Sequence, residues 1–116
     1  MHPGQINRAR IQNTVKTLKW ISQIRIVDEA KSTNALLMAD AIAGAEDGTV
    51  LVTEVQSSGR GRRGRQWVSE AYQDLALSIL IRPQIPPEKY PILSFCVGMA
   101  IFDALEDICG NSLKLK

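Results

Sequence analysis

The chain has 116 residues, of which 45% are hydrophobic and 22% charged, and its formal net charge is +2. This length suits one domain with one hydrophobic core, and the small net charge argues against a generally basic nucleic-acid-binding protein. The cysteines, Cys96 and Cys109, lack the spacing of metal ligands, and the chain has one histidine, His2, so a zinc site is not expected.

Both cysteines lie in an apolar segment, which predicts buried, reduced thiols. No apolar run is long and unbroken enough to span a bilayer, and the N-terminus lacks the pattern of a secretory signal. These observations predict a cytoplasmic protein that has no membrane partner.

The first part of the chain carries helix and strand signals in turn. Residues 1–23 are predicted as an N-terminal helical segment, because apolar residues recur at helical spacing from Ile6 to Ser22. A β-branched run at 24–28 predicts a short strand. Hydroxyl residues before 34–43 and Gly44 after it predict a helix that is capped at both ends.

The second part of the chain predicts two more strands and a long helix. Residues 49–55 are apolar and β-branched, as in an interior strand, and apolar residues alternate along 75–82, which predicts another strand. Four of the five prolines lie in 83–91 and predict a rigid connection. Residues 92–109 predict a buried helix that becomes polar near its end and is capped by Gly110.

The last residues, 113–116, begin an alternating strand that no turn or cap closes. A natural domain seldom ends in this way, so the sequence predicts an incomplete, truncated domain. An unpaired strand would form an open sheet edge that can pair with another chain. We therefore expect self-association, such as a homodimer, or a marginally stable fold.

The segment from Gln56 to Trp67 tells most about function. Three glycines alternate there with four arginines: Gly59, Arg60, Gly61, Arg62, Arg63, Gly64 and Arg65. Glycine lets a backbone bend close to a ligand, and guanidinium groups form bidentate hydrogen bonds with phosphate or carboxylate oxygens. This composition predicts a flexible loop between two strands that captures an anion. A solvated basic turn and an RNA-binding Arg-Gly segment are the alternatives.

This loop, with Trp67, resembles the adenylate-binding loop of biotin protein ligases. Ser32-Thr33-Asn34 matches that family's Ser-Thr-Asn signature, and Gln56 matches the glutamine that ends the strand before the loop. Lys116 falls where the family has the lysine that opens a Lys-Trp-Pro-Asn motif. The resemblance covers about residues 24–116, and the loop is its most specific part.

The resemblance implies an α+β fold, in which a mixed β-sheet carries helices mainly on one face. Residues 24–116 would form the N-terminal part of the catalytic domain shared by biotin and lipoate ligases. The implied activity uses ATP and Mg²⁺ to form biotinyl-5'-AMP, and then transfers biotin to a lysine. The implied partner is the biotin carboxyl carrier protein of acetyl-CoA carboxylase, and no DNA binding is expected.

The resemblance also implies roles for individual residues. The implied biotin-binding residues are Ser32, Thr33, Asn34, Gln56, Gly59, Arg60, Gly61 and Trp67. The implied adenylate- and phosphate-binding residues are Arg60, Arg62, Arg63, Gly64, Arg65 and Trp67. Arg62 and Lys116 are the implied catalytic residues, and no protein ligand for a metal is identified. Plain helix capping by Ser32 and Thr33, and core packing by Trp67, are the structural alternatives.

The chain departs from the family's pattern after Trp67. The family usually has Ser-Pro, a glycine-containing turn and Leu-Tyr-Leu-Ser, whereas residues 69–78 here lack the proline, the glycine and the strand tyrosine.

Two other functions stay open: a non-catalytic module that binds biotin or an adenylate, and a lipoate or octanoyl transferase. Nucleic-acid binding through the Arg-Gly loop would require affinity that falls steeply with salt.

Overall fold

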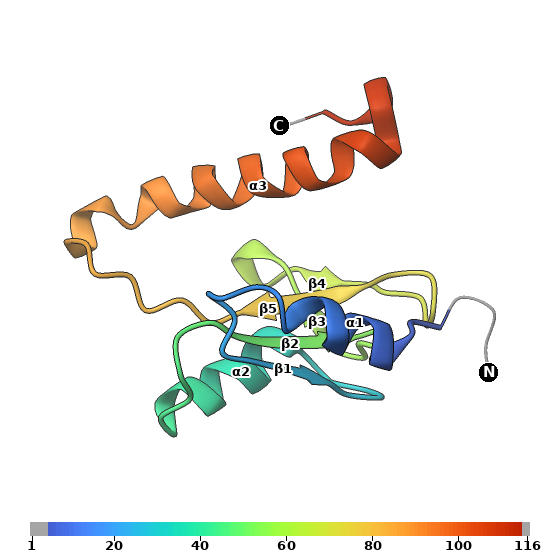
Figure 1. The fold of residues 1–116 in the computed structure, drawn as a ribbon, viewed down its shortest axis with the longest axis horizontal. Helices are drawn as coiled ribbons and strands as arrows, with labels where there is room; N and C mark the ends of the chain where they lie inside the picture. Colours follow the sequence, from blue (N-terminus) through green and yellow to red (C-terminus); the bar gives the residue numbers. More distant parts are fainter. Residues whose placement is uncertain (1–4, 115–116) are drawn as a thin grey trace. The chain divides into compact units, whose positions relative to one another are not determined.

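The computed structural model of the chain describes residues 5–114 (Figure 1). It divides into two compact units, one ending at Arg82 and the other beginning at Pro83. The first unit contains every strand assigned in the described residues, together with two α-helices. The second contains one long α-helix and short 3-10 turns.

A mixed sheet forms the centre of the first unit. Its strands are β1 (Gln23–Ile26), β2 (Thr49–Thr53) and β5 (Ala76–Ile79), in the order β1-β2-β5. β1 runs parallel to β2, and β5 runs antiparallel to it. All five residues of β2 are buried, which explains the continuous apolar and β-branched sequence that predicted an interior strand. The fold is therefore α+β, as expected.

Helix α2 (Thr33–Ile42) packs against β2 and β5. Ser32 is its N-cap, and its hydroxyl accepts a hydrogen bond from the backbone N–H of Ala35 at 3.2 Å. Gly44 follows the helix at φ +102°, a left-handed conformation that favours glycine. Leu37 is 4% exposed and anchors the helix on the sheet. The capped helix predicted from the sequence is confirmed.

Helix α1 (Arg8–Val15) is shorter than predicted, since the sequence signal extended to Ser22. The chain leaves the helix after Val15 through successive turns, in which Thr17 donates its hydroxyl to the carbonyl of Thr14. Ser22 then binds the turn that precedes β2. Its N–H donates to the carbonyl of Gly48, and its hydroxyl donates to the carbonyl of Asp47. These contacts start the β1–β2 ladder, and pairing with a distant strand overrides the local helical pattern.

The arginine-rich segment is a small hairpin rather than an irregular loop. β3 (Gly59–Arg60) pairs antiparallel with β4 (Gln66–Trp67), and a 3-10 turn at Arg62–Gly64 joins them. The N–H of Gly61 donates to the carbonyl of Arg65 at 2.7 Å. Arg63 and Gly64 have φ of +60° and +73°, so two left-handed residues close the turn.

The second unit contains α3 (Pro91–Cys109), between 3-10 turns at Pro87–Lys89 and Gly110–Ser112. The predicted helix and its glycine cap, at φ +56°, are confirmed. Its predicted burial is wrong, because no residue of α3 is buried: this unit holds one helix and short turns, which cannot enclose a side chain. Cys96 is exposed and Cys109 half-buried, so the prediction of buried thiols is also wrong.

The predicted strand at 113–116 lies partly outside the described residues. Leu113 and Lys114 are described, and neither belongs to a strand. In the described part of the chain, no helix is both long enough and apolar enough to cross a membrane.

Candidate functional site

A pocket of about 340 Å³ opens in the first unit where three segments meet. These segments are the start of α2, the stretch from Gln56 to β3 that follows β2, and the strands β4 and β5 with the turn between them. Six of the eight residues expected to bind biotin line the pocket: Ser32, Thr33, Asn34, Gln56, Arg60 and Trp67. Ser69, Asp74, Leu75, Ala76 and Leu77 complete its wall.

Backbone pairing beyond the regular strands brings the first two segments together. The N–H of Val27 donates to the carbonyl of Val52 at 3.0 Å, and the N–H of Ala30 donates to that of Val55 at 3.0 Å. The N–H of Ser57 then donates back to the carbonyl of Ala30 at 3.1 Å. The parallel β1–β2 ladder therefore continues irregularly, and it carries the N-terminus of α2 beside Gln56.

Four side chains form a polar network beside the pocket: Thr33, Asn34, Gln56 and Ser78. Gln56 Oε1 accepts the backbone N–H of Thr33 at 2.9 Å and lies 3.4 Å from the Thr33 hydroxyl. The Ser78 hydroxyl lies 2.8 Å from Thr33 Oγ1 and also bonds to the side-chain amide of Asn34. Thr33 and Ser78 are 4% and 7% exposed, so these bonds compensate for burial of polar groups.

Gly59 lies against the Gln56 amide and is not among the residues that line the pocket. A Cβ at this position would stand 2.7 Å from Gln56 Nε2 and 2.9 Å from the backbone oxygen of Trp67. Only glycine therefore allows the Gln56 amide and the β4 backbone to come so close. Gly61 has more space, since its nearest neighbour would be Arg65 Cβ at 3.4 Å.

The arginine hairpin, residues 59–67, forms a second, open hollow of about 510 Å³. Its lining residues are Gly61, Arg62, Arg63, Arg65, Gln66 and Trp67. Each of the four arginines is free of any ion pair with an acidic side chain of the described residues, so their charge is available to an anion. Of the residues implied for the adenylate, Gly64 contributes no lining to either hollow.

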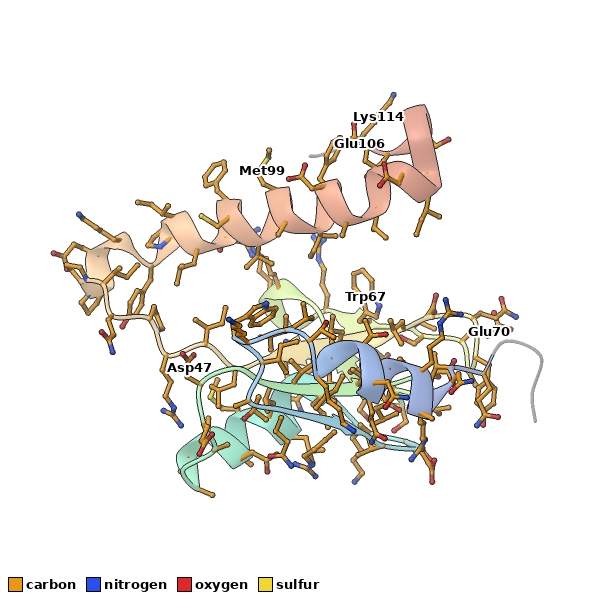
Figure 2. The ribbon with its side chains drawn as sticks, in the orientation of Figure 1. Asp47, Trp67, Glu70, Met99, Glu106 and Lys114 are labelled. Carbon is orange, nitrogen blue, oxygen red and sulfur yellow. The ribbon has the colours of Figure 1, made fainter. Side chains whose placement is uncertain are left out.

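Trp67 lines both hollows. Its side chain is 64% exposed and projects from β4, as Figure 2 shows, so core packing does not explain it. An aromatic wall shared by two neighbouring hollows can contact two parts of one ligand. Uncharged polar side chains of Ser32, Thr33, Asn34 and Gln56 line the pocket beside the network, and arginines line the hollow beyond Trp67.

Sequence reasoning missed five lining residues of the pocket and the network residue Ser78. Ala76 and Ser78 lie two residues apart on β5, and period-two spacing could have grouped them on one side of the strand. Nothing local could show that this side faces Thr33, which lies 45 residues away from Ser78 in the sequence. In the turn before β5, the N–H of Tyr72 donates to the carbonyl of Glu54 at 3.1 Å, and Tyr72 has φ +62°.

Two further expectations concern catalysis. Lys116, the second implied catalytic residue, lies outside the described residues. Within residues 5–114, no group of three or more His, Cys, Asp or Glu side chains is placed to hold a metal ion.

Comparison with known proteins agrees with the resemblance. The model of the biotin/lipoate A/B protein ligase family matches residues 26–116. A biotin–[acetyl-CoA-carboxylase] ligase from Mycobacterium tuberculosis is 40% identical over 85 residues, which are 72% of this chain and 32% of the relative. The bifunctional ligase/repressor BirA of Bacillus subtilis is 29% identical over 114 residues, which are 98% of this chain and 35% of the relative.

A biotin–[acetyl-CoA-carboxylase] ligase from Paracoccus denitrificans is 37% identical over 87 residues, or 75% of this chain and 35% of the relative. The chain thus spans about a third of the length of these curated relatives. Because the family model covers residues 26–116, which include both hollows, the match is not confined to one motif. The chain belongs to the biotin/lipoate A/B protein ligase family.

Proposed function

We propose that this chain carries the biotin- and adenylate-binding part of an ATP-dependent biotin protein ligase. The observation that carries this function is the pairing of the two hollows across Trp67. One has a polar network at its end, and the other is lined by Arg62, Arg63 and Arg65. Biotin has an uncharged polar ring system at one end and a carboxylate at the other, which matches this division.

The reaction joins the biotin carboxylate to the α-phosphate of ATP and releases pyrophosphate. Both reacting groups are anions and repel each other, so arginine side chains near them lower the free energy of their approach. Arg60 lines the pocket and Arg62 lines the hollow beyond Trp67. We therefore expect these two cations to act on the two anions as they approach each other. In the second step a carrier lysine attacks the mixed anhydride and displaces AMP.

The expected Mg²⁺ enters with ATP. The described residues offer no cluster of carboxylates or histidines that fits a metal held by the protein, so no step is assigned to a metal site. Lys116 keeps its proposed role, which is to place a positive charge beside the reacting oxygens, on the strength of the family resemblance alone.

We expect the pocket to prefer biotin to a lipoyl group because its lining offers hydrogen-bonding side chains. Thr33, Asn34 and Gln56 present amide and hydroxyl groups at the pocket wall. The cyclic urea of biotin has N–H donors and a carbonyl acceptor that can use such groups, whereas the dithiolane ring of lipoate has none. The carboxylase ligases among the relatives agree with this preference.

The decisive experiment is a thermal melt of the chain with a non-hydrolysable biotinyl-adenylate analogue, and with the matching lipoyl analogue as control. A ligand at a hundredfold over its dissociation constant stabilises the folded state by about 2.7 kcal/mol. We expect only the biotinyl compound to raise the melting temperature. A shift with the lipoyl compound alone would assign the pocket to a lipoyl ligand, and no shift with either would contradict ligand binding by this chain.

A further inference from the structure

Ser78 is a buried polar residue for which the adenylation reaction has no direct use. It lies on β5 opposite Leu51 of β2, and it is 7% exposed. Its hydroxyl reaches across to the first turn of α2, where it contacts Thr33 Oγ1 and the side-chain amide of Asn34. A hydroxyl buried in this way costs free energy unless it is bonded, so its bonds hold β5 and α2 together at the pocket.

The proton of Ser78 gives this network a direction. A hydroxyl carries one proton, so Ser78 donates to only one of its two partners at a time. When Thr33 Oγ1 accepts it, at 2.8 Å, the proton of Thr33 is available to Gln56 Oε1 at 3.4 Å. When Asn34 Oδ1 accepts the Ser78 proton instead, the Ser78 oxygen is left as an acceptor for the Thr33 hydroxyl.

The end of the network is the side-chain amide of Gln56. Its oxygen accepts the backbone N–H of Thr33 at 2.9 Å and faces the Thr33 hydroxyl, so the carbonyl is engaged inside the protein. Its nitrogen has no acceptor among the described residues. An amide with its oxygen held in this way has only its N–H₂ group left to offer a ligand.

We propose that Ser78 is a positioning residue that, through Thr33, fixes the Gln56 amide so that the pocket offers its ligand a hydrogen-bond donor. This inference rests on the proposed function, because the ligand considered is biotin. The donor suits a ligand that brings a carbonyl oxygen, as the cyclic urea of biotin does. A ligand that places an N–H group at this position leaves that group and the Gln56 N–H₂ group without an acceptor, so it binds more weakly than biotin.

The test compares biotin with 2-iminobiotin, in which a guanidine replaces the urea and is protonated at neutral pH. Dissociation constants are measured by titration calorimetry for the unmodified chain and for Ser78→Ala, Ser78→Thr and Ile79→Ala. In Ser78→Ala the Thr33 hydroxyl can turn away from Gln56 Oε1, so the amide is held by the Thr33 N–H alone. We expect the preference for biotin to fall by at most on the order of tenfold, the worth of one hydrogen bond. Ser78→Thr keeps the hydroxyl and restores the preference.

Ile79→Ala is the matched control, because Ile79 lies on the same strand, is 41% exposed and lines neither hollow of the site. It can lower stability, but it leaves the ratio of the two affinities unchanged. An unchanged ratio in Ser78→Ala would overturn the positioning role. So would an equal loss of preference in Ile79→Ala, which would show that general destabilisation is the cause.

A ligand-free measurement separates this inference from the function on which it rests. Hydrogen exchange by NMR reports the bond from the Thr33 N–H to Gln56 Oε1. We expect faster exchange at Thr33 in Ser78→Ala and exchange at the original rate in Ser78→Thr. If the unmodified chain binds neither compound, the proposed function fails, and unchanged Thr33 exchange in Ser78→Ala would separately refute the role of Ser78.

Discussion

The polar network and the arginine hairpin prepare for a ligand in opposite ways. In the network, Thr33 and Ser78 are almost fully buried and their polar atoms are already bonded to each other or to Gln56. In the hairpin, Arg62, Arg63 and Arg65 are exposed and have no acidic partner in the described residues. One region is ordered before the ligand arrives, and the other holds charges whose partner must be the ligand.

This difference separates two physical tasks. An uncharged ring system is recognised by donors and acceptors in fixed positions, which require a buried, bonded framework. A phosphate is attracted by charge over a longer distance, and exposed guanidinium groups supply that attraction before contact. Substitutions in the network should therefore change stability and selectivity together, whereas substitutions of the exposed hairpin arginines should change affinity with little effect on stability.

Gly59→Ala should produce the largest effect, because Gly59 joins the two regions. The added Cβ would approach Gln56 Nε2 to 2.7 Å and the Trp67 backbone oxygen to 2.9 Å, so the hairpin must move. We expect a loss of roughly 2–3 kcal/mol in the free energy of unfolding, as for an overpacked site. Urea denaturation measures this loss.

Gly61→Ala is the control for this change. Its Cβ would lie 3.4 Å from the nearest atom, a tolerable contact, so its effect on unfolding should be much smaller. Equal destabilisation by the two substitutions would show that the close approach at Gly59 is not the constraint.

Arg62→Gly should weaken binding of the biotinyl-adenylate analogue and leave the fold intact. A hydrogen bond to a charged group contributes about 1.5–3 kcal/mol, so we expect affinity to fall by at least tenfold. Titration calorimetry measures the affinity, and a melt without ligand measures stability. Lys19→Gly removes an equal charge from a residue that lines neither hollow, and it should not alter affinity. Unfolding of Arg62→Gly would identify the hairpin as structural.

Thr33→Val should lower stability and biotin affinity together. It keeps the shape of the side chain and removes the hydroxyl between Ser78 and Gln56, at a cost of about 1–2 kcal/mol. Thr49→Val is a matched control: Thr49 is 3% exposed and its hydroxyl donates to the carbonyl of Glu46 at 2.7 Å, outside the pocket. Thr49→Val should lose similar stability without losing biotin affinity. A similar loss of affinity in both variants would deny Thr33 a specific role.

Salt should produce the smallest effect, and it distinguishes the two regions without any substitution. Raising ionic strength screens exposed charges and leaves uncharged buried hydrogen bonds almost unaffected. We expect the affinity for the adenylate analogue to fall severalfold, while the affinity for biotinamide, which has no carboxylate, changes by less than about twofold. Equal salt dependence of the two ligands would contradict the division of the site.

The sequence predicted the local elements well where short-range interactions decide them. Helix α2 lies between Ser32 and Gly44, as expected, and α3 begins at Pro91 and is capped by Gly110. The β-branched run at 49–53 is a buried strand. Six residues expected to bind biotin line one pocket, because the Ser-Thr-Asn segment and Gln56 follow paired strands. The segment whose arginine-glycine composition predicted anion binding also lines the second hollow, and anion binding itself stays a prediction.

The sequence failed where a residue responds to a distant partner. The N-terminal helix ends at Val15, because the residues that follow bind the chain around Gly48 and lead into β1. The apolar pattern of 92–109 predicted burial, but the amount of burial depends on what surrounds a helix, and the second unit contains one α-helix.

The sequence by itself thus determined the helices α2 and α3, the interior strand β2 and the residue types that can hold an anion, because caps, turns and periodicity act over a few neighbouring residues. The tertiary structure decided that Ser78 meets Thr33 and that Gly59 must lack a side chain. These contacts depend on the β1-β2-β5 strand order, which brings together residues dozens of positions apart, and no local pattern records that order.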